Sequence, residues 1–307
     1  MRWKGRRQST NVEDRRGTTV RGGGGPAMGG ALGGLVFSLF RRGSGKTKLI
    51  LIAGVIIACF VFKMNPLSLL GLSGGGGGGT QLVQNPNAKP DQQTYDYLST
   101  LKADNEDVWS KILPRYGLKY RPSKMVIYSD KTTMTGGIAD ARMGPFYAPS
   151  EEKIYIDPGF FQELKRKFGA KGDFAEAYVL AHEVGHHIQK IMKRTDYVHS
   201  QRRKLSDADY NKLSVRLELH ADFLAGVFAH HGQEQFKFLE RGDIQEALDC
   251  AEAIGDDRLQ ERAHGHVQPE SFTHGTSEQR RKWFMHGYKT GDLRQGEQIY
   301  TMPYEDL

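Results

Sequence analysis

The chain has little cysteine and little tryptophan for its length. Only two of its 307 residues are cysteine and three are tryptophan. Cys59 lies inside an apolar run and Cys250 lies in a segment with helical spacing, so we expect no disulfide between them. A small domain held together by disulfides is therefore excluded, and Cys250 is interpreted as a small core residue.

The chain also lacks a basic folded region, although its net charge is +7. Residues 1–48 carry eleven Lys and Arg against two acids, a net charge of +9, which leaves −2 for residues 49–307. The excess positive charge thus belongs to the N-terminal segment. A globular domain that binds DNA or RNA is not expected, and no nucleic-acid partner is predicted.

No uninterrupted apolar run reaches the roughly 20 residues that a bilayer core requires. The run 49–62 has fourteen residues, and the apolar stretch after Lys63 can extend it. We therefore predict one transmembrane signal-anchor helix over 49–69, in contact with membrane lipid. Four basic residues within 41–48 precede it, which predicts a cytoplasmic N-terminus and an extracytoplasmic domain. A cleaved secretory signal and a lipoprotein signal at Cys59 are the alternatives, and the long preceding segment argues against both.

Composition divides the chain into four parts. Residues 1–48 are rich in arginine and glycine and poor in apolar side chains, so we predict a disordered basic tail that lies in the cytoplasm. After the predicted helix over 49–69, a run of six glycines over 74–79 marks a linker, 70–90. The remaining residues, 91–307, form one predicted domain.

The predicted domain is α+β, mainly helical with a small sheet. A strand is predicted over Lys124–Tyr128, and alternating polar and apolar residues predict another over Lys153–Ile156. Helical spacing runs from about Asp207 to His231, where Gly232 is a stop signal. A further helix is predicted over Ser277–His286. These elements surround the residues that carry the chemistry.

The most informative stretch is His182–His186, which reads HEVGH. On an α-helix, two histidines four residues apart project from the same face and can bind one metal ion. The side chain of Glu183 between them can hold a water molecule and accept its proton. A neighbouring apolar stripe, and Asp173 with Glu176 as a predicted capping box, favour a helix here.

A third ligand is expected, because a catalytic zinc ion normally takes three protein ligands. The spacing that uses a third histidine fails, since Gln189 and Met192 occupy the places of its glycine and histidine. Glu218, thirty-two residues after His186, fits the gluzincin arrangement, in which a glutamate comes from a following helix. Asp222 lies one turn later and can accept the outer N–H of a ligating histidine. The alternative is that both acids are solvated residues on a helix surface. Other candidate third ligands are His230, His231, His264 and His266.

Stretches at both ends and in the middle of the chain carry a further signal. They read MRWKGRR (1–7), NVEDRR (11–16), AHEVGHHIQ (181–189), SVRLEL with the following AD (214–222) and SFTHGTSEQR (271–280). In these stretches the chain resembles the putative neutral zinc metallopeptidases of bacteria. The resemblance implies a membrane-anchored, zincin-like protein of the bacterial inner membrane. It also implies His182, His186 and Glu218 as ligands of one Zn²⁺ and Glu183 as the general base.

His274 is our candidate for the group that stabilises the oxyanion formed in peptide hydrolysis. Integral-membrane quality-control gluzincins carry a similar histidine followed by arginine, which here points to His274 and Arg280. The alternative is a histidine that caps a loop. In zincins the strand before the metal-binding helix is the edge on which substrate lies, a role that the resemblance implies for Lys153–Ile156.

We therefore predict a membrane-anchored zinc endopeptidase that acts on polypeptides. One alternative is a catalytically weak, chaperone-like protein that binds zinc in the same fold, although an intact Glu183 argues against it. Another is a scaffold whose Arg/Gly-rich tail binds acidic lipid or RNA. The sequence predicts neither a particular substrate nor the oligomeric state.

Overall fold

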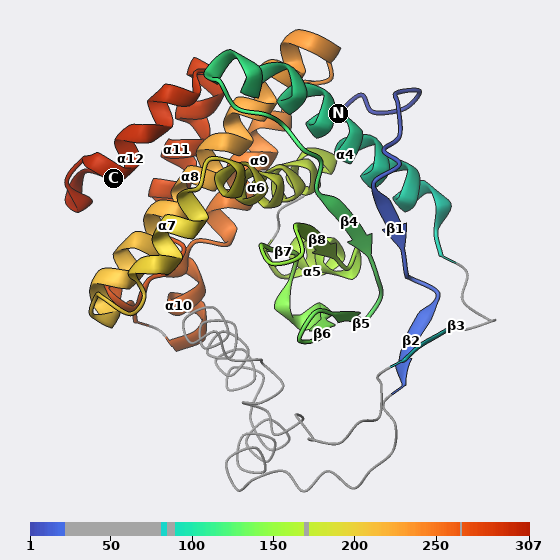
Figure 1. The fold of residues 1–307 in the computed structure, drawn as a ribbon, viewed down its shortest axis with the longest axis horizontal. Coiled ribbons are helices and arrows are strands. Elements are labelled where there is room, and N and C mark those ends of the chain that lie inside the picture. Colours follow the sequence, from blue (N-terminus) through green and yellow to red (C-terminus); the bar gives the residue numbers. More distant parts are fainter. Residues whose placement is uncertain (22–80, 85–89, 169–171, 265) are drawn as a thin grey trace, which may run out of the picture.

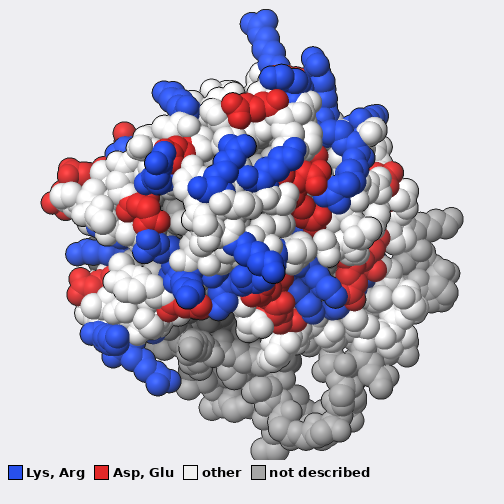
Figure 2. Space-filling model, turned by 45° about the horizontal axis from the view of Figure 1, so that its top comes forward, with Lys and Arg blue, Asp and Glu red and all other residues white. Residues whose placement is uncertain are grey.

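Helices make up most of the fold, beside a small four-stranded sheet (Figure 1). The structure, a computed structural model, describes residues 1–21, 81–84, 90–168, 172–264 and 266–307. The predicted fold class, mainly helical with a small sheet, agrees with this architecture. Figure 2 shows basic and acidic side chains interspersed over one face.

The elements follow one another in chain order. The strands are β1 (Val12–Asp14), β2 (Thr18–Arg21), β3 (Gln81–Gln84), β4 (Lys124–Ile127), β5 (Lys131–Met134), β6 (Gly137–Asp140), β7 (Phe146–Ala148) and β8 (Lys153–Ile156). The α-helices are α4 (Gln92–Ile112), α5 (Gly159–Phe168), α6 (Asp173–Ile191), α7 (Arg194–Gln201), α8 (Asp207–Phe236), α9 (Asp243–Ala253), α10 (Asp256–His264), α11 (Ser277–Thr290) and α12 (Gln298–Thr301). Short 3₁₀ turns are η1 (Leu113–Tyr116), η2 (Ala141–Met143), η3 (Pro269–Ser271), η4 (Leu293–Glu297) and η5 (Tyr304–Asp306).

The main sheet has the order β1-β4-β8-β7. β4 lies parallel to both β1 and β8, while β7 is antiparallel to β8. Strands over Lys124–Ile127 and Lys153–Ile156 agree with the sequence prediction. The implied role of Lys153–Ile156 as the edge is wrong, because β8 has hydrogen-bonded neighbours on both sides. The edge strand that contacts α6 is β7.

Residues 1–21 are part of the folded domain. Val12 pairs with Met125 in the sheet, and the ammonium group of Met1 lies 2.6 Å from a carboxylate oxygen of Asp173. Arg7 forms an ion pair with Asp107 at 2.8 Å on α4. The predicted disorder over 1–48 is therefore wrong for 1–21, since Met1 joins the apolar core and the arginines of this segment pair with acids of the domain. Residues 22–48 of that tail lie outside the described residues.

The membrane prediction needs correction. The predicted span, 49–69, lies outside the described residues, and within the described ranges no helix is long and apolar enough to cross a bilayer. The pairing of β2 with β3 also contradicts the predicted orientation, because Arg21 lies opposite Gln81 in an antiparallel ladder. A single crossing between these two residues would place hydrogen-bonded strands on opposite sides of a membrane. We therefore assign neither a single-pass anchor nor an inner-membrane location. The predicted linker, 70–90, is described only over 81–84, which form β3, and at residue 90.

The helices α6, α8 and α11 pack closely because glycines stand at their contacts. A Cβ atom added to Gly185 of α6 would lie 3.0 Å from the carbonyl oxygen of Ala221 on α8. A Cβ on Gly287 of α11 would overlap the carbonyl oxygen of Phe223. The helices can approach this closely only while these positions carry no side chain. Leu224 on α8, which is fully buried, lies beside Gly185 and fills the space around this contact.

Two predicted helix signals are wrong. α6 begins at Asp173 after Gly172, and Asp173 with Glu176 forms no capping box; Asp173 contacts the Met1 ammonium instead. The carboxylate of Glu246 on α9 accepts from the backbone N–H of Phe174 in the first turn at 3.1 Å. α8 continues through Gly232 to Phe236 and ends where Lys237 adopts a left-handed conformation. Gly232 is explained by packing, because a Cβ atom there would lie 2.6 Å from the ring of Phe238.

Candidate metal centre

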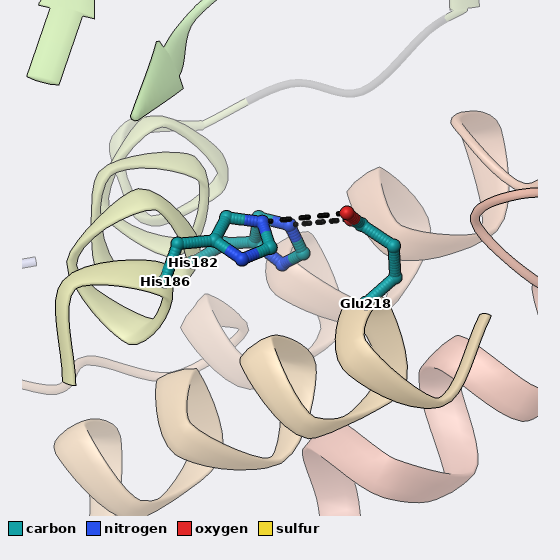
Figure 3. Close-up of side chains that lie close together, drawn as sticks. All are labelled: His182, His186 and Glu218. Atoms are coloured by element: carbon teal, nitrogen blue, oxygen red, sulfur yellow. Dashed lines mark hydrogen bonds and ion pairs between the residues drawn. The ribbon is translucent and has the colours of Figure 1, made fainter. Parts of the chain in front are cut away.

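Two helices bring the three predicted ligands together (Figure 3). His182 and His186 project from α6, and Glu218 reaches them from α8. The Nε2 atom of His182 lies 3.2 Å from Oε2 of Glu218, and Nε2 of His186 lies 3.5 Å from Oε1. The three side chains are only 8, 13 and 9% exposed. The alternative interpretation of Glu218 as a solvated surface acid is therefore wrong.

The outer nitrogen of each imidazole faces an oxygen atom. Nδ1 of His182 lies 2.8 Å from Oδ1 of Asp222, as predicted, and Nδ1 of His186 lies 2.9 Å from Oε1 of Gln189. The amide group of Gln189 donates to the carbonyl oxygen of Leu217, which leaves its own oxygen to accept from His186. Both Nδ1 atoms therefore carry hydrogen, and both Nε2 atoms present a lone pair when the rings are neutral.

Asp222 is fully buried and is held by more than one donor. The hydroxyl group of Tyr178 donates to it at 2.5 Å. Nε and Nη2 of Arg280 donate to its two oxygens at 2.8 and 3.0 Å. Burial alone would raise the pKa of Asp222, but the charges of Arg280 and His182 outweigh burial and hold the pKa at about 2. Asp222 therefore stays ionised and fixes the orientation of His182.

The electrostatics of the three ligands favour a positive charge between them. Burial alone would lower the pKa of His182, but Asp222 and Glu218 outweigh it and raise the pKa to about 10. Burial alone would raise the pKa of Glu218, but His186 and His182 hold it well below its usual value. Two imidazoles and one carboxylate with ligand atoms within 4.8 Å of one another suit Zn²⁺, which prefers such a donor set. The residues present therefore fit the implied metal.

Glu183 is buried beside the two histidines. Burial raises the pKa of its carboxyl group, while the charges of His186 and His182 partly oppose this rise. A hydrogen bond from the backbone N–H of Tyr147, on the edge strand β7, also opposes it. Glu183 does not belong to the group of three candidate ligands, His182, His186 and Glu218. Its carboxyl group is therefore available to exchange a proton.

His274 lies in the loop before α11 and is oriented by Asp256. Nδ1 of His274 lies 3.0 Å from one oxygen of Asp256. The other oxygen of Asp256 accepts from the backbone N–H groups of Thr273, His274 and Gly275. Burial would lower the pKa of His274, but Asp256 and then Glu218 raise it above its usual value. The loop is thus capped by Asp256, and His274 lies close enough to Glu218 to interact with its charge.

Comparison with known proteins adds the family. A family model described as putative neutral zinc metallopeptidase matches residues 1–299. The chain belongs to this family. Its description names zinc and peptide hydrolysis, so at this level of detail the chain is a zinc metallopeptidase, and the suspected resemblance is confirmed.

The chain matches relatives over different shares of its length. It is 43% identical over 295 residues to YpfJ of Escherichia coli (strain K12), covering 96% of this chain and 97% of that protein. It is 40% identical over 195 residues to Mb2605 of Mycobacterium bovis, covering 60% of this chain and 64% of that protein. Both relatives carry the word uncharacterized in their names. No solved structure matches the chain.

Several site residues of this metallopeptidase are absent from the sequence-based prediction. They are Tyr178, Gln189, Asp256 and the backbone of Tyr147. Gln189 follows His186 by one helical turn, so helical spacing alone could have indicated its contact. No spacing links Asp256 to His274, because that pairing depends on how α10 packs beside α11. The other candidate third ligands His230 and His231 lie about three turns beyond Glu218 on α8 and do not reach the centre.

Proposed function

We propose that the protein is a zinc-dependent endopeptidase of the gluzincin type. The observation that carries the proposal is the convergence of His182, His186 and Glu218 with Glu183 beside them. A site that only stabilised the fold would usually have four protein ligands and no use for an adjacent buried base. Three ligands with a glutamate beside them suit a hydrolase.

The proposed chemistry divides between the metal and the chain. Zinc, when bound, supplies a Lewis acid that acidifies water and polarises the carbonyl group of the peptide bond. Glu183 takes the proton from the attacking water and passes it to the leaving amine. The raised pKa of Glu183 suits this exchange, because a stronger base accepts the proton more readily.

We also propose His274 as the group that stabilises the oxyanion. Its Nδ1 is held by Asp256, which leaves Nε2 to donate to a substrate oxygen. The side chain is 36% exposed, so a bound polypeptide can reach it. Asp256 keeps the ring in one orientation and favours its protonated form.

The edge strand supports polypeptide as the substrate class. β7 is the last strand of the sheet, contacts α6, and has an edge that no other described strand covers. An extended peptide can add to such an edge through backbone hydrogen bonds. Tyr147 on this strand also donates its backbone N–H to Glu183, which links the proposed substrate position to the proposed base.

Cleavage of a labelled unfolded protein, such as casein, by the full chain tests the proposal. Glu183→Gln is expected to lower turnover by at least about 100-fold while the zinc ion of this centre stays bound. Glu218→Ala is expected to lose the zinc ion of this centre and the activity. One bound zinc ion without cleavage that depends on Glu183 would instead favour the catalytically weak, chaperone-like alternative. A protein that binds no zinc would exclude both.

A further inference from the structure

A second group of metal-ligating side chains lies on α8, away from the centre described above. It consists of His230, His231 and Glu234, whose ligand atoms lie within 4.8 Å of one another. Nδ1 of His231 lies 2.9 Å from Oε2 of Glu234, and Nε2 of His230 lies 3.6 Å from Oε1. Twelve residues separate His230 from Glu218 along the same helix, a distance of roughly 18 Å. The two groups are therefore separate.

The C-terminal end of α11 fixes both imidazole rings. Nδ1 of His230 lies 2.8 Å from the carbonyl oxygen of Tyr288, and Nε2 of His231 lies 2.8 Å from that of Gly291. A backbone carbonyl can only accept a hydrogen bond, so each of these two nitrogens carries hydrogen. Outer N–H groups held by backbone carbonyls are typical of histidines that bind metals.

The inner nitrogens then face Glu234 as lone pairs when the rings are neutral. Nδ1 of His231, Nε2 of His230 and the carboxylate of Glu234 are all acceptors and gather at one place. Three acceptors this close need positive charge among them, which either protons or a shared cation can supply.

The surroundings of the group are shaped for the two rings. Gly291 ends α11 with a positive φ of 60°, and a Cβ atom on it would lie 2.5 Å from the His230 ring. The histidine side chains are 28 and 16% exposed, while Glu234 is 64% exposed. A cation bound here would therefore be held by two fixed imidazoles and one exposed carboxylate, and would be open to water on its remaining side.

We propose that His230, His231 and Glu234 form a second, peripheral site for a divalent transition-metal ion. Two imidazoles and one carboxylate suit Zn²⁺, Cu²⁺ or Ni²⁺ and do not suit Ca²⁺ or Mg²⁺, which prefer oxygen ligands. The site joins α8 to the end of α11. These are the helices that carry Glu218 and Arg280, so metal bound here stabilises the scaffold of the candidate active centre from its far side.

Zinc stoichiometry of the full chain tests this site. Equilibrium dialysis at micromolar free Zn²⁺, followed by metal analysis, is expected to give two ions per wild-type chain. The double variant His230→Ala/His231→Ala is expected to bind one ion, and Glu234→Gln to bind the second ion more weakly by at least about tenfold. His286→Gln is the matched control, a histidine of α11 outside the metal-holding groups of the described residues, and is expected to bind two ions.

Glu218→Ala separates this site from the proposed active centre. It is expected to bind one ion, and zinc is expected to raise its melting temperature, because a ligand that binds only the folded state stabilises it. Adding Glu234→Gln to Glu218→Ala is expected to abolish most of that rise. A wild-type chain that binds a single ion, lost in Glu218→Ala, overturns the proposal and leaves the proposed function intact. A second ion that persists unweakened in Glu234→Gln overturns it as well.

Discussion

Arg280 and Asp222 form a buried ion pair directly behind His182. Both side chains are almost completely buried, and Arg280 donates to both oxygens of Asp222. Removal of one partner leaves the other charge buried without compensation, which is strongly destabilising.

We expect Arg280→Met to lower the free energy of unfolding by about 3 to 5 kcal/mol. Urea denaturation at neutral pH measures this change. The double variant Arg280→Met/Asp222→Asn serves as the control, because it removes both charges and is expected to recover part of the loss. Equal stability of the single and double variants would contradict the account of this pair.

Glu176 predicts a pH dependence of stability. Burial and the nearby charge of Asp173 raise its pKa to about 7 in the folded protein, against an ordinary value of 4.5. Between these two pH values the folded state binds more protons than the unfolded state, so this group makes stability fall as pH rises from about 4.5 to about 7.

We expect Glu176→Gln to stabilise the protein by about 2 kcal/mol at pH 8 and to change little at pH 4, because glutamine resembles the protonated acid. Chemical denaturation of the wild type and the variant at both pH values measures the effect. A variant that gains as much at pH 4 as at pH 8 would show that burial of the charge is not the cause.

At the scale of residues, the sequence predicts the metal ligands better than the side chains that orient residues of the site. His182 and His186 are four residues apart on one helix, so helical geometry alone places them together. Glu218 required the further step of matching a known ligand arrangement. The contact of Asp256 with His274 could not be predicted, because it depends on how α10 and α11 pack.

At the scale of elements, the glycines between helices set the distance from α6 to α8. Gly185 stands within the HEVGH stretch, and a Cβ atom on it would press against the backbone of Ala221 at 3.0 to 3.2 Å. That backbone belongs to the helix that carries Glu218. Alanine has the higher helix propensity, by about 1 kcal/mol, but a rigid backbone neighbour cannot move aside without shifting a helix.

We therefore expect Gly185→Ala to weaken zinc binding and to lower the free energy of unfolding by about 1 kcal/mol net. Gly287→Ala is expected to destabilise more, since its Cβ overlaps the carbonyl oxygen of Phe223. Thermal unfolding and a zinc competition assay give the ranking. Gly287→Ala leaves the contact between α6 and α8 alone and so should affect zinc less than stability.

Helix boundaries show where local sequence signals stop being sufficient. Gly232 is of a residue type that often ends helices, yet α8 continues past it. A glycine is needed here because the ring of Phe238 occupies the space beside it. Asp173 is of a residue type that often caps helices, but its carboxylate contacts the Met1 ammonium instead. Tertiary contacts thus override local preference at both positions.

At the scale of the whole molecule, the N-terminal segment completes the sheet. β1 covers one edge of β4, and Ser9 and Asn11 bond to Glu106 on α4. Composition gives no sign of this role, because the segment has few apolar residues and depends on contacts of Met1, Trp3 and its arginines with residues distant in the sequence. The folded domain therefore includes residues before 91, the position at which composition placed its first residue.

A chain that lacks residues 1–21 is expected to lose more than about 4 kcal/mol of stability, because it exposes an edge of β4 and removes Arg6, the ion-pair partner of the buried Asp104 on α4. Circular dichroism and thermal unfolding measure the loss. Arg15→Ala is a suitable control, since it leaves β1 in place. Unchanged unfolding of the shortened chain would show that the segment adds nothing to the domain.

The ladder between β2 and β3 has a consequence for engineering. Arg21 and Gln81 are directly paired, so the last described residue before the gap and the first one after it lie side by side. A two-residue Asn-Gly turn can join such a pair. A chain shortened in this way, with residues 22–80 replaced by that turn, would keep the contacts described above and provide a minimal protein for crystallisation and metal titration.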